Sequence, residues 1–151
     1  MPDLVIADTS CIIVLTKIDE LDLLRQTYHS IWIPPEVARE YNRIIPNWIS
    51  IESPSEFAIE SVRGLMLDPG ELSAIALATE LPDSLLMLDD NDARKAATAL
   101  RLRVTGTLGV VIAAKQAGIL NSVIPVFEKI RATDFYVSEE IFIRAIKEAG
   151  E

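Results

Sequence analysis

The chain has 151 residues, of which 50% are hydrophobic and 25% charged, and its mean hydropathy of +0.27 excludes a disordered, collagen-like or low-complexity protein. This length predicts a single domain, residues 1–151, with a core large enough to fold without disulfides or a structural metal. The net charge of −9 argues against a protein that coats nucleic acid by bulk attraction, and the longest apolar run, residues 109–114, is too short to span a bilayer.

Short aliphatic runs typical of buried strands alternate with longer helical patterns along the chain. The first strand is expected over residues 4–7 and the second over residues 30–33, where Pro34 and Pro35 stop it. Further strands are expected over residues 48–51, as an edge strand, over 84–88 and over 102–105, and residues 134–137 are expected to be extended.

Helices are expected between these strands. The clearest start is at Asp68, because Pro69 follows it and Glu71 comes three residues later, which is the pattern of a capping box that opens a helix to Glu80. The other helical segments are residues 12–24 (one or two helices), 36–43, 55–66, 92–100 and 107–117, and a terminal helix that Ser138 caps. This alternation predicts an α/β fold, a three-layer α/β/α sandwich with a mainly parallel central sheet.

Charge is segregated along the chain. Residues 1–92 contain 17 acidic and 5 basic side chains, whereas residues 93–131 contain 7 basic side chains and 1 acidic one. The basic side chains could line a phosphate-binding rim beside an acidic centre, or they could be solvated helix faces. They are Arg94, Lys95, Arg101, Arg103, Lys115, Lys129 and Arg131.

Acidic residues follow two of the expected strands. Asp8 ends the first strand, and Asp89 and Asp90 end a later one. Open parallel sheets bind ligands at the carboxyl ends of their strands, so Asp8 and Asp90 converge if these strands are neighbours. Glu40 and Glu71 could join them from adjacent helices, and the positive end of a helix dipole favours the ionised form of Glu71.

A site built only from carboxylate oxygens indicates a hard cation such as Mg²⁺ or Mn²⁺. Such a cation lowers the pKa of bound water and stabilises charge on phosphoryl oxygens, which is the chemistry of phosphodiester hydrolysis. The adjacent Asp89 and Asp90 also repel one another unless they are solvated or bind a cation. This pattern therefore favours a metal-dependent hydrolase.

Each acidic residue also has a purely structural interpretation. Glu71 could be only the reciprocal partner of Asp68 in the capping box, and Glu40 could be an exposed residue paired along its own helix. Asp92 could be the N-cap of the helix that follows it, a role compatible with an indirect contribution to a metal site. Asp8 could belong to an ordinary capping turn, although its position at a strand end favours a functional role.

Other catalytic systems find little support. His29 is the only histidine and lies in an expected connection, so a Ser/His or Cys/His system would depend on it. Cys11, the only cysteine, lies in an apolar helix start and is expected to be a small core residue. Residues 106–109 lack the spacing and the lysine of a P-loop. The single cysteine and an N-terminus without the basic region of a signal peptide predict a cytoplasmic protein.

Four short motifs resemble the PIN-domain superfamily. They are Asp8-Thr9-Ser10 after the first strand, Pro34-Pro35-Glu36-Val37 leading to Glu40, Gly70-Glu71 with Ala74 and Ala76, and Leu88-Asp89-Asp90 with Arg94. Residues 104–109, with Ala114-Lys115 and Gly118, look like one branch of PIN-like prokaryotic proteins related to VapC-type toxins. The resemblance covers about residues 4–120.

The resemblance implies a Mg²⁺- or Mn²⁺-dependent endoribonuclease and the toxin of a toxin–antitoxin pair. It places the catalytic acids at Asp8, Glu40, Glu71 and Asp90, and the metal ligands at Asp8, Glu71, Asp90 and Asp92, with Thr9 or Ser10 as a nearby hydroxyl. Because Asp89 adjoins Asp90, either of these two residues could be the ligand at this strand end. The implied partners are RNA, a basic antitoxin-like protein and a second copy of the chain in a homodimer, with no membrane.

Two further functions compete with this hypothesis. A catalytically inactive PIN-like module would bind a basic segment of another protein in the same acidic groove, without dependence on metal. A receiver-like domain would be phosphorylated on Asp8 or Asp90, but a receiver has its acidic pair near the first strand, and here the pair comes late. The RNA-cleaving hydrolase is therefore the leading hypothesis.

Overall fold

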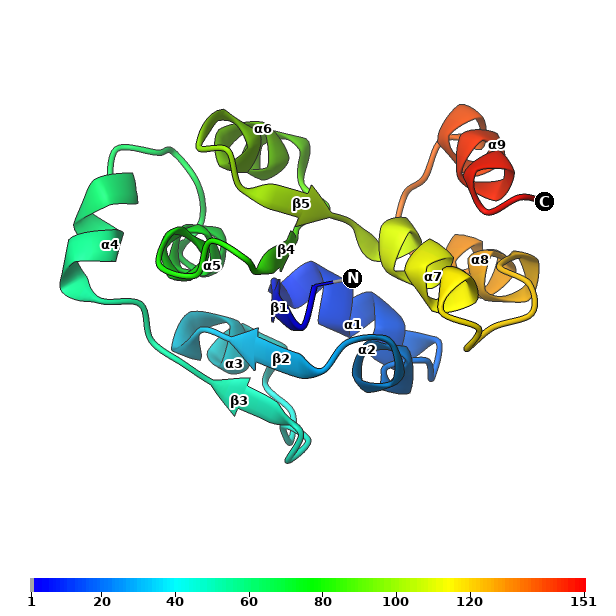
Figure 1. Cartoon of the computed structure of the whole chain (residues 1–151), viewed down its shortest axis with the longest axis horizontal. Coiled ribbons are helices and arrows are strands. Elements are labelled where there is room, and N and C mark those ends of the chain that lie inside the picture. The colour runs from blue at the N-terminus through cyan, green and yellow to red at the C-terminus, as the bar shows by residue number, and fades with distance from the viewer. Residues whose placement is uncertain (1) are drawn as a thin grey trace.

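A computed structural model describes residues 2–151 and contains a five-stranded sheet in the order β3-β2-β1-β4-β5 (Figure 1). The strands are β1 (Leu4–Ala7), β2 (Ser30–Ile33), β3 (Ile49–Ile51), β4 (Leu85–Met87) and β5 (Arg103–Thr105). All pairings are parallel, and the central β1 places Ile6 opposite Trp32 of β2 and Leu86 of β4. The expected parallel sheet and the edge position of β3 are thus confirmed, and the strands that precede Asp8 and Asp90 are neighbours.

Nine helices connect and cover the strands within residues 2–151. They are α1 (Thr9–Lys17), α2 (Asp22–Thr27), α3 (Pro35–Tyr41), α4 (Glu56–Val62), α5 (Pro69–Thr79), α6 (Asn91–Ala99), α7 (Thr107–Gln116), α8 (Ile124–Arg131) and α9 (Glu139–Glu148). The sequence predicted no element where α8 lies, although Pro125 stands in its first turn. Residues 134–137 pair with no strand; Phe135 and Val137 instead pack partly against the core.

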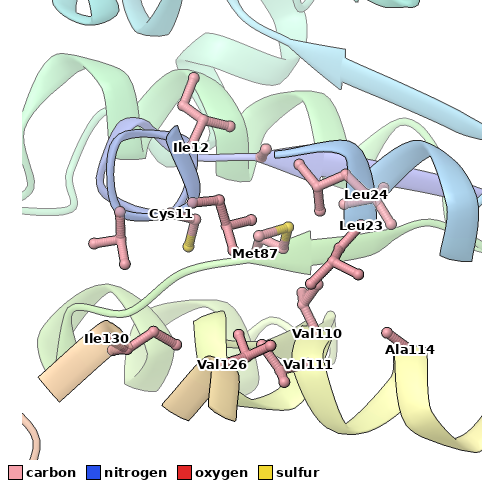
Figure 2. Packing of buried hydrophobic residues seen from close by; sticks show 14 of the residues in the cluster. Cys11, Ile12, Leu23, Leu24, Met87, Val110, Val111, Ala114, Val126 and Ile130 are labelled. Carbon is pink, nitrogen blue, oxygen red and sulfur yellow. The ribbon is translucent and has the colours of Figure 1, made fainter. Parts of the chain in front are cut away.

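Helices cover both faces of the sheet, because successive side chains of a strand point to opposite sides. Val5 and Ala7 face a core shared with α1, α2, α3, α7, α8 and α9, whereas Ile6 faces a core shared with α4, α5 and α6. Figure 1 shows α4 and α5 on one side of the strands and α1, α2 and α7 on the other. Figure 2 shows Cys11 and Met87 within the first of these cores, beside Val110. The three-layer α/β/α prediction is confirmed.

No helix among residues 2–151 is long and apolar enough to cross a membrane.

Candidate active site

The carboxyl ends of β1 and β4 lie side by side where the order of the strands reverses. The backbone N–H of Asp8 donates to the carbonyl of Met87 at 3.2 Å, so the two strands stay paired up to this edge. Doubly wound sheets bind their ligands at such a switch point, because the connecting helices leave it in opposite directions and open a crevice. Asp8 on one strand and Asp89 and Asp90 beyond the other therefore frame the expected binding position.

Asp8 is held at this edge almost without solvent contact, with only 6% of its surface exposed. Burial and, to a smaller extent, the negative charges of Asp68, Glu40 and Asp89 together raise the pKa of its carboxyl from 3.8 to about 6, against the lowering effect of a hydrogen bond from the Thr9 backbone. Four carboxyl groups from separate segments thus act on one another at the end of β1.

The N-terminus of α5 brings Glu71 to the same place. Asp68 Oδ1 accepts from the backbone N–H of Glu71 at 2.8 Å, and Glu71 Oε1 accepts from the backbone N–H of Asp68 at 3.3 Å. This is the expected capping box. Glu71 is also buried, and its pKa is raised to about 7 by burial and then by the charges of Asp68, Asp8 and Asp90. Glu71 is therefore both a capping residue and a neighbour of the other acids.

Glu40 reaches this group from α3. Its carboxylate lies against the first turn of α5, so closely that a Cβ atom on Gly70 would overlap Glu40 Oε1. Burial of the carboxyl and the charge of Asp68 raise the pKa of Glu40. The Thr9 hydroxyl is buried and makes no hydrogen bond, yet it lies near enough to Glu40 to favour the ionised form of that carboxyl.

The two aspartates after β4 have different surroundings. Asp89 accepts three hydrogen bonds, from the Thr107 backbone N–H at 2.9 Å, the Thr107 hydroxyl at 2.7 Å and Cys11 Sγ at 3.0 Å. Asp90 is exposed and accepts one hydrogen bond, at 3.0 Å, from the first turn of α6, while its charge raises the pKa of Glu71. Asp90 thus keeps more oxygen lone pairs for a ligand, which favours it over Asp89.

Asp92 is not the cap of α6, which corrects the preferred structural interpretation of this residue. The helix begins at Asn91, so Asp90 is the cap and Asp92 lies exposed in the first turn. An N-cap side chain must reach the backbone N–H two or three residues ahead, and only Asp90 is placed to do so here.

A family model described as "PIN domain" matches residues 4–151. The chain belongs to the PIN-domain family. PIN domains are generally nucleases and typically use divalent metal ions. A search of curated proteins finds no match to the chain.

The basic side chains of residues 93–131 in this PIN domain have different surroundings. Arg94 Nη1 donates to the carbonyl of Leu88 at 2.8 Å and ties α6 to the end of β4. Arg103 binds the carbonyl of Asp83 at the opposite edge of the sheet. Lys115, Lys129 and Arg131 form ion pairs with Glu151, Glu20 and Glu139, respectively. The ion pairs of Lys115, Lys129 and Arg131 favour the interpretation of these three as solvated helix faces, whereas Arg94 lies with Asp89 against Gly106 at the site.

Sequence reasoning missed two features of the site. Asp68 was considered only as a cap, although a capping residue three positions before Glu71 necessarily lies beside it. Arg39 and Arg43 are exposed and lie next to Glu40 in the sequence, and Arg39 forms an ion pair with Glu36 at 3.8 Å. The charge count grouped both arginines with the acidic majority of residues 1–92 and therefore did not single them out.

The oxygen donors of this site are of the type that a hard cation prefers, but they are not arranged around one common ion position. Asp8, Glu40, Asp68, Glu71 and Asp90 all offer carboxylate oxygens, and the Thr9 hydroxyl is buried without a hydrogen-bond partner. Within residues 2–151, no three His, Cys, Asp or Glu side chains are arranged so that they could hold one metal ion. The capping bonds of Glu71 and Asp90 each occupy one of the two carboxylate oxygens, Oε1 of Glu71 and Oδ2 of Asp90.

Proposed function

We propose that this PIN domain is a metal-dependent endoribonuclease that hydrolyses RNA phosphodiesters at the acidic site. The observation that carries the proposal is the buried Asp8 at the switch point, whose pKa is raised to about 6 by burial and then by the neighbouring carboxyl groups. Such crowding of like charge destabilises the folded chain, and groups perturbed in this way are concentrated at functional sites. A bound cation would offset the repulsion.

The acids would have two roles, which are to hold a cation and to position the substrate. Asp8, Glu71 and Asp90 would hold Mg²⁺ or Mn²⁺, with Asp92 as a further ligand, and the ion would stabilise charge on the phosphoryl oxygens and lower the pKa of a water molecule. The Thr9 hydroxyl lies near enough to Glu40 to favour its ionised form.

Backbone and side-chain bonds keep the acids in place for this role. The first turn of α6 donates to Asp90, and the backbone N–H of Asp68 donates to Glu71. The exposed guanidinium groups of Arg39 and Arg43 would bind phosphates of the RNA on either side of the cleaved bond.

Cleavage of a labelled single-stranded RNA tests this proposal. The wild-type protein is expected to cut internally with Mn²⁺ or Mg²⁺ and not with EDTA, and Asp8→Asn and Asp90→Asn are expected to abolish cutting while circular dichroism shows an intact fold. Asp83→Asn is the matched control, because this exposed residue lies at the opposite edge of the sheet. Unchanged cleavage by purified Asp8→Asn would contradict the proposal, and equal cutting of single-stranded DNA would broaden the substrate class.

We further propose that the protein acts in the cytoplasm as a homodimeric toxin that a basic antitoxin-like protein neutralises. The net charge of −9 supports a basic partner. Light scattering is expected to give twice the chain mass of 16.7 kDa. A monomer at micromolar concentration would contradict the dimer without affecting the nuclease proposal.

A second candidate is a catalytically inactive module that binds a basic protein segment. It is favoured by the absence, within residues 2–151, of three acidic, cysteine or histidine side chains arranged about one ion. A lysine- and arginine-rich peptide would then bind equally well with EDTA or Mn²⁺, and Asp8→Asn would weaken it. Binding that Mn²⁺ displaces favours the nuclease.

A further inference from the structure

We propose that Gly70 is a positioning residue, whose missing side chain leaves the space in which the Glu40 carboxylate lies at the acidic site. This inference rests on the proposed metal-dependent function and names a determinant of that site. Glu40 is carried by α3 and Gly70 by α5, so the contact joins two separate helices.

The contact between these residues is tight. A Cβ atom added to Gly70 would overlap Glu40 Oε1 and lie 3.3 Å from Glu40 Cδ and 3.5 Å from Asp68 Oδ1. Outside its chain neighbours and the backbone of α5, the nearest atoms are those of the Glu40 and Asp68 carboxylates, which therefore bound this space. A methyl group there and the present position of Glu40 are mutually exclusive.

Backbone conformation does not explain the glycine. Gly70 lies in the first turn of α5 and is not among the glycines with positive φ, which are Gly118 and Gly150 within residues 2–151. Alanine is compatible with a helical backbone and has the higher helix propensity. The need for glycine at this position therefore comes from the space that Glu40 fills.

The Thr9 hydroxyl is a second buried polar group beside the Glu40 carboxylate. Thr9 is 6% exposed, and its buried Oγ1 atom makes no hydrogen bond. Buried hydroxyl groups normally have a partner, because leaving them without one costs free energy. This hydroxyl lies near enough to Glu40 to lower the pKa of that carboxyl, so the space at Gly70 lets Glu40 lie both against α5 and beside Thr9.

The added methyl group would move Glu40 without unfolding the protein. The overlapping atom is the end of a flexible side chain on an exposed residue, so the carboxylate can swing towards solvent. Gly70→Ala therefore changes the position of the Glu40 carboxylate without removing it. Gly64→Ala is the matched control, because a Cβ atom at Gly64 would meet nothing within 4 Å.

Calorimetric titration with Mn²⁺ tests the inference. Gly70→Ala is expected to weaken Mn²⁺ binding about 10- to 100-fold, the usual effect of disturbing a residue that orients a metal site, whereas Gly64→Ala binds as the wild type does. In the Glu40→Ala background, Gly70→Ala is expected to have no further effect. The electron paramagnetic resonance spectra of Mn²⁺ bound to Gly70→Ala and to Glu40→Ala should coincide. A general structural role would instead weaken binding equally in both backgrounds.

The outcomes separate this inference from the nuclease proposal. Mn²⁺ binding that Asp8→Asn abolishes but Gly70→Ala leaves unchanged overturns the role of Gly70 alone. If the wild type binds no Mn²⁺, the metal proposal fails, and urea unfolding without metal still tests the contact. Gly70→Ala is then expected to lower the free energy of unfolding more when Glu40 is present than in the Glu40→Ala background. Equal changes in the two backgrounds overturn the inference.

Discussion

Replacing Asp8 with asparagine removes a buried charge while nearly preserving the size of the side chain. Burial, Asp68 and Glu40 raise the pKa of Asp8 from 3.8 to about 6 in the folded chain. Between these pH values the folded state therefore holds a proton that the unfolded state has lost. The free energy of unfolding of the wild type is expected to fall as pH rises through this window, and the full cost of the charge is present above it.

The magnitude follows from the pKa values. One pKa unit corresponds to about 1.4 kcal/mol, so a rise from 3.8 to about 6 corresponds to about 3 kcal/mol. Solvent screens this effect little, because Asp8 is only 6% exposed. Asp8→Asn is therefore expected to be up to about 3 kcal/mol more stable than the wild type at pH 8, which is about 6–12 °C in Tm for a chain of this size. The difference should vanish near pH 3.

Urea unfolding followed by circular dichroism, in EDTA and at several pH values, measures this difference. Asp83→Asn, an exposed substitution, serves as the control and is expected to follow the wild type. Adding Mn²⁺ at 100 times its Kd should stabilise the wild type by about 2.7 kcal/mol and leave Asp8→Asn unchanged. If Asp8→Asn is equally or less stable than the wild type at pH 8, or if the difference does not depend on pH, the buried charge of Asp8 does not destabilise the folded chain.

Three further predictions concern the surroundings of Asp8. Asp90→Ala should destabilise the protein by about 1 kcal/mol in urea unfolding because α6 loses its cap, whereas Asp90→Asn should retain that stability; equal losses would contradict the capping role. Thr107→Val removes a buried donor from Asp89 and should cost about 1–3 kcal/mol in the same assay, and unchanged stability would count against this bond. Arg39→Ala and Arg43→Ala should each weaken RNA binding measured by fluorescence anisotropy and lower the salt slope by about 0.7, and an unchanged slope would exclude a phosphate contact.

The fold was predictable because its signals are local. Aliphatic runs marked every strand, and the Asp68, Pro69 and Glu71 pattern marked the start of α5 within one residue. The helix α8 was missed because its apolar side chains become informative only when they pack on the core through Phe127 and Ile130. Local patterns therefore predicted the sheet and the terminal helix α9, which Ser138 caps as expected, but not α8.

The candidate site was predictable in its residues but not in their contacts. Asp8 and Asp90 stood out because each follows a buried strand, and the pairing of β1 with β4 brings those strand ends together. The sequence could not separate Asp89 from Asp90, because the difference lies in hydrogen bonds from Cys11 and Thr107, which are distant in the chain. Pairings of this kind depend on the tertiary fold.

Titration of the metal-free protein with Mn²⁺, beside Asp8→Asn and the control Asp83→Asn, shows directly whether the acidic site binds a cation. We expect saturable binding by the wild type and by Asp83→Asn, and no binding by Asp8→Asn. Binding that survives in Asp8→Asn, or its absence from the wild type, would contradict a cation site built on the carboxylates at the ends of β1 and β4.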